Sequence, residues 1–162
     1  MSIEISLSAD EVMVARLIGA HRYRHAESCG WVNKNVDGAD GVEKHIYGVA
    51  AELAACSAVN AFPDLQTEPS AVPWYDYKLP CGETVDVKAT PSDSGRLIAH
   101  IGYGKKTHVA DLFLLVTGQI PNFTVVGYVR REELINEKRI GDLGHGPTYI
   151  VPQDDPAFIK LV

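Results

Sequence analysis

The sequence predicts an α/β domain in which helices flank a central mixed β-sheet. Three observations support this fold class. Two helical patterns come first, a tight hairpin pattern follows at residues 74–88, and residues 111–116 form the continuous apolar run of a strand buried on both faces. The chain has 162 residues, of which 46% are hydrophobic and 22% charged, so we expect residues 1–162 to form one domain around one core.

Two helices are predicted before the hairpin. Ser8-Ala9-Asp10-Glu11 is a capping-box pattern, and apolar residues at helical spacing follow it to about residue 26. Asp40-Gly41-Val42-Glu43 begins a second helix, which should end near residue 60, before the next proline. The apolar stripe of this helix consists of Ile46, Val49, Leu53 and Cys56. Glu52 lies beside the stripe, among alanines that permit close packing on a sheet.

The segment at residues 74–88 predicts a β-hairpin with a defined register. Pro80 suits the second position of a type I turn, and Gly82 suits the left-handed residue that completes a short loop with a bulge. Counting outward from this loop pairs Tyr77 with Val85 and places Asp76 opposite Asp86, with Trp74 opposite Lys88. The turn chemistry therefore predicts two facing carboxylates.

The two faces of the hairpin carry different side chains. Because side chains alternate along a strand, the apolar face consists of Tyr75, Tyr77, Leu79, Val85 and Val87. The other face consists of Trp74, Asp76, Lys78, Thr84, Asp86 and Lys88. Opposed carboxylates about 5 Å apart repel each other, and a divalent cation between them would convert repulsion into coordination. The alternative is an exposed sheet face on which the two lysines balance the aspartates.

Further elements are predicted downstream, as strands at 96–101, 111–116, 122–129 and an edge strand at 148–151, with a short helix starting at 131–135. The connection at 102–110 is short for a parallel crossover, so we expect a single helical turn or an irregular loop there. The segments at 28–39, 63–73 and 141–147 are rich in glycine, proline or asparagine and are expected to be loops.

Composition excludes several classes of protein. No apolar run approaches the roughly 20 residues that span a bilayer, and no basic region precedes an apolar block at the N-terminus, so we expect a cytoplasmic protein without membrane contact. The three cysteines are widely spaced, which argues against a disulfide framework or a zinc site. A net charge of −6 argues against broad, charge-driven binding of nucleic acid but permits a local basic patch.

A glutamate-bearing helix followed by an Asp…Asp-x-Lys hairpin resembles the core of the PD-(D/E)XK nuclease superfamily. GVAAELAACSAVN is similar to the first helix of this family, and YDYKLPCGETVDVKAT is similar to its hairpin. DLFLLV and TVVGYVRREEL look like the strands that follow in small phage and mobile-element members. The resemblance implies a restriction-endonuclease-like core at about 42–129, an N-terminal helix at 8–26 and a C-terminal extension at 130–162.

The resemblance also implies a function, a cofactor and a set of site residues. It implies a nuclease that uses Mg²⁺, for which Mn²⁺ can substitute, to hydrolyse phosphodiester bonds, most often in DNA. Asp76 and Asp86 would bind the metal together with the carbonyl oxygen of Val87. Glu52 would bind it directly or through water, and Lys88 would orient or activate the attacking water. Hard oxygen ligands of this kind select Mg²⁺ or Mn²⁺.

A second register of the same motif is open. Pro63-Asp64 with Asp76-Tyr77-Lys78 also matches the motif literally. This register would place Asp64 in a loop and leave Asp86 and Lys88 without a role.

The expected partner is nucleic acid, and a homodimer would suit double-strand cleavage. Lys105, Lys106 and His108 are candidates for holding phosphates near the site, with Tyr103 stacking on a base. Two other functions are open: a non-catalytic nucleic-acid- or protein-binding domain on the same fold, and a different metal-dependent hydrolase that acts on nucleotides.

Overall fold

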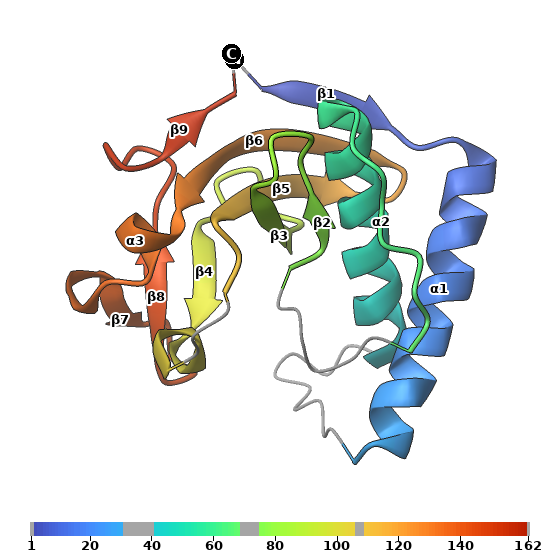
Figure 1. Ribbon diagram of the computed structural model, residues 1–162, viewed down its shortest axis with the longest axis horizontal. Coiled ribbons are helices and arrows are strands. Elements are labelled where there is room, and N and C mark those ends of the chain that lie inside the picture. Colours follow the sequence, from blue (N-terminus) through green and yellow to red (C-terminus); the bar gives the residue numbers. More distant parts are fainter. Residues whose placement is uncertain (1, 31–40, 69–74, 106–108, 162) are drawn as a thin grey trace.

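The computed structural model describes residues 2–30, 41–68, 75–105 and 109–161. A curled mixed β-sheet is flanked by helices, which confirms the predicted fold class (Figure 1). In the described part of the chain, no helix combines the length and the apolar character needed to cross a membrane.

Both predicted N-terminal helices are present. Helix α1 (Ala9–Ser28) begins at the predicted capping box, because the Ser8 hydroxyl accepts from the Glu11 N–H while the Glu11 carboxylate accepts from the Ser8 N–H. Helix α2 (Gly41–Val59) lies between α1 and the sheet (Figure 1). The two helices pack closely at Gly19, where a Cβ atom would lie only 2.5 Å from the Cα of Ile46. Asp40, the expected start of α2, lies outside the described residues.

The central sheet has the strand order β1-β6-β5-β3-β2, and β9 pairs with Gly127 and Tyr128 of β6, beyond the residues that pair with β1. Its strands are β1 (Ile3–Ser6), β2 (Tyr77–Lys78), β3 (Thr84–Thr90), β5 (Leu112–Gln119), β6 (Asn122–Arg130) and β9 (Ile159–Lys160). Strands β3 and β5 are parallel, and the other pairs are antiparallel. The short strands β1 and β9 were not predicted from the sequence.

Strand β5 is buried on both faces, as its continuous apolar sequence predicts. Leu114 and Val116 pack into one core cluster together with α1 and α2, whereas Phe113 and Leu115 pack into a second cluster on the opposite face. The alternation of side chains thus divides one apolar run between two cores. The buried β5 fixes the neighbouring β3, which carries Asp86 and Lys88.

The second core is closed by a separate three-stranded sheet of order β4-β8-β7. Its strands are β4 (Leu97–His100), β7 (Ile140–Asp142) and β8 (Pro147–Val151). The prediction of 148–151 as an edge strand was wrong, because β8 pairs with a strand on each side. The prediction of a loop at 141–147 was wrong at both ends, because its first two residues belong to β7 and Pro147 is the first residue of β8.

The connections after β4 and β6 are short helical turns. The single turn expected within 102–110 is the 3-10 helix η1 (Ile101–Lys105). The predicted short helix after β6 is α3 (Arg131–Leu134), which is followed by a second 3-10 helix, η2 (Glu137–Arg139).

Candidate functional site

The hairpin turn has the predicted geometry. Gly82 adopts a φ of 98°, and its N–H donates to the Leu79 carbonyl at 2.9 Å. The Leu79 N–H donates to Glu83 at 2.8 Å, and Tyr77 pairs with Val85. The register inferred from the turn residues is therefore confirmed between the turn and the Tyr77–Val85 pair.

Asp76 departs from the predicted ladder. The β2–β3 pairing ends at Tyr77, and the Asp76 N–H donates instead to the Val85 carbonyl at 2.8 Å. The Asp76 carboxylate then accepts the Val87 N–H at 2.6 Å, so a side chain replaces the backbone acceptor that a longer strand would supply. Asp76 is thereby fixed beside the edge of β3 that carries Asp86. Trp74, expected opposite Lys88, lies outside the described residues.

Asp86 is buried, with only 5% of its surface exposed. Lys88 Nζ lies 2.6 Å from Asp86 Oδ1, and the Tyr103 hydroxyl donates to Asp86 Oδ2 at 2.8 Å. The same hydroxyl accepts from Lys88 Nζ at 3.0 Å, which closes a three-residue network. This burial does not fit the alternative of an exposed sheet face on which lysines merely balance the aspartates.

Lys88 is held in its protonated form. Burial alone would lower its pKa, but Asp86 and Tyr103 outweigh burial, so the pKa of Lys88 lies above its ordinary value. Burial and the neighbouring Asp86 also raise the pKa of Tyr103 to about 12. At neutral pH both groups therefore keep their protons and can donate hydrogen bonds.

Glu52 reaches the site from α2 and is paired with an arginine from α1. Arg22 Nη1 lies 2.8 Å from Glu52 Oε2, and both side chains are largely buried. The remaining guanidinium nitrogens donate to the carbonyls of Asp64 at 2.8 Å and Gln66 at 2.9 Å. Burial raises the pKa of Glu52 and Arg22 opposes this, with a net pKa above the ordinary value.

The three carboxylates act on one another electrostatically. The pKa of Asp76 lies well above its ordinary value, first because of burial and then because of repulsion from Glu52 and Asp86. The Val87 N–H and the Lys88 ammonium only partly offset this rise. Such a cluster of acids is costly when fully ionised, and a bound cation would lower that cost.

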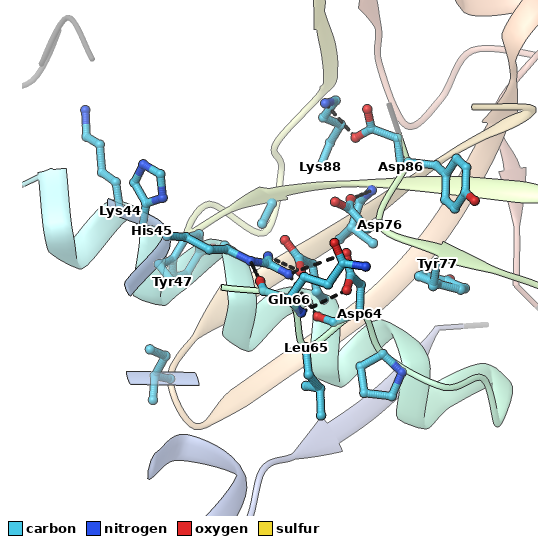
Figure 2. Close-up of a pocket in the computed structure, with 18 of the residues that line it drawn as sticks. Lys44, His45, Tyr47, Asp64, Leu65, Gln66, Asp76, Tyr77, Asp86 and Lys88 are labelled. Atoms are coloured by element: carbon cyan, nitrogen blue, oxygen red, sulfur yellow. Dashed lines mark hydrogen bonds and ion pairs between the residues drawn. The ribbon is translucent and has the colours of Figure 1, made fainter. Parts of the chain in front are cut away.

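One cleft of about 1870 Å³ is lined by the three carboxylates together with Arg22, Lys88 and Tyr103. This volume exceeds the roughly 300–1,000 Å³ of a typical small-molecule pocket, so the cleft has room for a segment of a polymer. Figure 2 shows Asp76, Asp86 and Lys88 at one side of the cleft and Lys44, His45 and Tyr47 at the other, with Asp64 and Gln66 between them.

The donors suit a hard divalent cation, but they are engaged with protein groups. Within residues 2–30, 41–68, 75–105 and 109–161, no three His, Cys, Asp or Glu side chains are arranged to hold a metal ion. Glu52 pairs with Arg22, and Asp86 pairs with Lys88. Metal binding would require these carboxylates to exchange at least part of their present contacts.

The alternative register places its residues differently. Asp64 lines the cleft, where its carboxylate accepts the Gln66 N–H at 2.9 Å and lies 3.9 Å from Arg22 Nη2. Lys78 is exposed on β2 and is not part of the cleft lining, whereas Lys88 is. The geometry therefore favours the register built on Asp86 and Lys88.

Two of the candidate nucleic-acid-binding residues, Tyr103 and Lys105, lie in η1. Tyr103 points its hydroxyl into the acidic site, and its ring packs edge-on against Phe113 with centroids 5.7 Å apart. Lys105 is exposed at the last position of η1. Lys106 and His108 lie outside the described residues.

Arg22 is the site residue that the motif did not indicate. Its position contained a signal, because Arg22 follows Ile18 by one helical turn on the inward side of α1. An arginine on a buried stripe requires a carboxylate or carbonyl partner, so this placement predicts a buried contact.

No family model matches this chain, and a search of curated proteins found no significant match.

Proposed function

We propose that the protein is a metal-dependent nuclease of the PD-(D/E)XK type that hydrolyses phosphodiester bonds, most readily in DNA. One observation carries this proposal. Glu52, Asp76 and Asp86 come from different elements and line one cleft beside Lys88, where their charges repel. Carboxylates that repel one another reduce the stability of the fold, whereas a cation-dependent reaction requires them as metal ligands.

The residues have distinct roles in the proposed reaction. Asp76, Asp86, the Val87 carbonyl and Glu52 would hold Mg²⁺, which when bound stabilises phosphate charge and favours ionisation of a water. Lys88 remains cationic because its pKa is raised, so it orients the attacking water and offsets charge on the phosphate. Tyr103 keeps the Lys88 ammonium and the Asp86 carboxylate in fixed positions.

The decisive experiment is a cleavage assay with a matched acidic control. Purified protein is incubated with supercoiled, linear and single-stranded DNA in Mg²⁺, Mn²⁺ or EDTA. We expect cleavage only with a divalent cation, and a loss of roughly a hundredfold or more in Asp86→Asn. Asp93→Asn removes an exposed carboxylate outside the cleft and should leave the rate unchanged. Full activity in EDTA or in Asp86→Asn overturns the proposal.

The second candidate is a non-catalytic nucleic-acid- or protein-binding domain on the same fold. The existing partners of the carboxylates favour it, since Arg22 pairs with Glu52 and Lys88 with Asp86 without any cation. This candidate predicts no cleavage of DNA or RNA and no stabilisation by Mn²⁺. A hydrolase that acts on free nucleotides would be distinguished from both candidates by its activity on nucleotides, which are therefore included in the substrate panel.

A further inference from the structure

An aromatic side chain stands exposed at the mouth of the acidic cleft. Phe62 is 82% exposed, the largest exposed fraction among the large hydrophobic side chains of the described residues, and it lines the cleft. Leu65, on the same segment, is 40% exposed and also lines the cleft. The protein core buries little of this ring, so its face is accessible to a ligand that enters the cleft.

The backbone before Phe62 is fixed. Helix α2 ends at Val59, and the next residue, Asn60, adopts a left-handed φ of 51°. The Ala61 N–H then donates to the Cys56 carbonyl at 2.9 Å, a bond that closes the end of the helix. The direction in which the chain leaves α2 is thus determined immediately before Phe62.

The backbone after Phe62 is also fixed. Arg22 donates to the carbonyls of Asp64 and Gln66, and the Asp64 carboxylate accepts the Gln66 N–H. Because Arg22 also binds Glu52, the segment that carries Phe62 is tied to the acidic site itself. The exposed ring therefore projects from a braced segment and does not need to be ordered when a ligand binds.

Cationic groups lie along the same cleft. Lys44 is exposed on the first turn of α2 and lines the cleft on the side away from Asp86 (Figure 2). An aromatic ring together with a cation beside a phosphodiester-cleaving centre is the combination that binds single-stranded nucleic acid. A duplex hides the faces of its bases, so only an unpaired base can stack on a side chain.

We propose that this cleft binds single-stranded nucleic acid, with one base stacked on Phe62 and a phosphate contacted by Lys44. The proposal rests on the proposed nuclease function, whose substrate it narrows to unpaired strands or to frayed ends. The net charge of −6 is consistent with single-strand binding, because base stacking contributes affinity that does not depend on neutralising phosphates, whereas the affinity for a duplex depends largely on phosphate contacts.

Binding is tested on an Asp86→Asn background, so that bound strands are not cleaved. Fluorescent single-stranded oligonucleotides and blunt duplexes of equal length are titrated with each variant. We expect tighter binding of the single strand, a loss of about tenfold in Phe62→Ala, and retention in Phe62→Trp. Leu143→Ala removes an exposed side chain from a turn outside the cleft and should change nothing.

The outcomes separate this inference from the proposed function. Unchanged single-strand affinity in Phe62→Ala, or a preference for duplex, overturns the inference even if the wild-type protein cleaves DNA. If the wild-type protein cleaves nothing with Mg²⁺ or Mn²⁺ while the Phe62 variants behave as expected, the nuclease proposal fails and the binding site stands.

A second feature lies on the opposite side of α2. Helix α1 packs on α2 through Ala15, Ile18 and Gly19, and it forms the outermost layer of the molecule (Figure 1). Its outward face exposes Met13 by 67% and Leu17 by 60%. These residues are one helical turn apart and form an apolar stripe.

Charges flank this stripe in a self-complementary way. Asp10 lies seven residues before Leu17 and Arg24 seven residues after it, so all three lie close to one line along α1. If two α1 helices pair antiparallel about Leu17, each Asp10 faces the Arg24 of the other copy. We infer that a second copy of the chain docks on this face through a twofold axis near Leu17.

Sedimentation equilibrium over a range of concentrations tests this dimer. We expect concentration-dependent dimerisation that is abolished in Leu17→Glu and preserved in Leu143→Glu, which alters a comparably exposed leucine elsewhere. Circular dichroism checks that Leu17→Glu keeps its helix content. Asp10→Arg should weaken the dimer, and adding Arg24→Asp should restore it. A wild-type monomer at all concentrations, or no restoration in the double variant, overturns the inference.

Discussion

The Tyr103 hydroxyl donates to the Asp86 carboxylate at 2.8 Å while it accepts from Lys88 Nζ at 3.0 Å. It thus holds in place both a proposed metal ligand and the proposed catalytic cation. Its ring is supported by the edge-on contact with Phe113 in the second core. The small sheet β4-β8-β7 closes that core, so packing on one side of β5 supports the polar network at β3.

Tyr103→Phe removes the hydroxyl and keeps the ring. We expect kcat for DNA cleavage to fall roughly 10–100-fold with little change in KM, because the lost contacts position groups and do not bind substrate. Steady-state kinetics with Mg²⁺ give both parameters. Tyr23→Phe is the matched control, since its hydroxyl bonds to Glu27 and Tyr23 does not line the cleft. An unchanged kcat in Tyr103→Phe would show that Lys88 and Asp86 hold their positions without it.

Asp76 makes metal-free stability depend on pH. Its folded pKa is raised, so as pH falls the folded state binds a proton before the unfolded state does, and stability rises. Conversely, stability is lost as pH rises from the ordinary carboxylate range through the raised pKa. Asp76→Asn should therefore gain stability relative to wild type, and the gain should grow with pH. Urea unfolding in EDTA at several pH values measures this difference.

Asp155 provides a control of opposite sign. Hydrogen bonds from Arg139 and from the Ala157 N–H lower the pKa of Asp155. Its ionised carboxylate therefore stabilises the folded protein at pH values above the ordinary carboxylate range, and this stabilisation is lost as pH falls through the lowered pKa. Asp155→Asn should accordingly lose stability relative to wild type at neutral pH. Equal and pH-independent effects of the two substitutions would contradict the proposed repulsion at Asp76.

A divalent cation should stabilise the folded protein by relieving the same repulsion. At one hundred times its dissociation constant, a ligand that binds only the folded state contributes about 2.7 kcal/mol. We expect Mn²⁺ to raise Tm in the wild-type protein, and to do so much less in Asp86→Asn. Differential scanning calorimetry with and without Mn²⁺ measures the shift. Identical shifts in both proteins would place the cation outside this cleft.

The sequence predicted those parts of the site that depend on local chemistry. Pro80 and Gly82 determine the turn, and the turn determines which residues of the hairpin pair. The departure of Asp76 from the ladder was not predictable in this way, because it depends on a side chain competing for the Val87 N–H. Pairing between distant segments was also missed, as the position of β8 between β4 and β7 shows.

Arg22 illustrates the same limit for the site. Helical spacing places it on the inward side of α1, but spacing cannot identify Glu52 as its partner or show that the chain at Asp64 and Gln66 returns to meet it. These contacts join segments that lie far apart in the sequence. They depend on how α1 and α2 cross at Gly19, which only the packed structure determines.

Arg22→Met tests how strongly these segments depend on the guanidinium. Its loss leaves Glu52 buried without a cation, so we expect a destabilisation of about 3 kcal/mol in urea unfolding. Adding Glu52→Gln should recover part of this loss, because the neutral amide no longer needs the charge. Arg16→Met is the matched control, since Arg16 lies 4.0 Å from Glu43 on an exposed surface and should contribute less than about 1 kcal/mol. Equal effects of the two arginine substitutions, or no recovery in the double variant, would contradict the role assigned to Arg22.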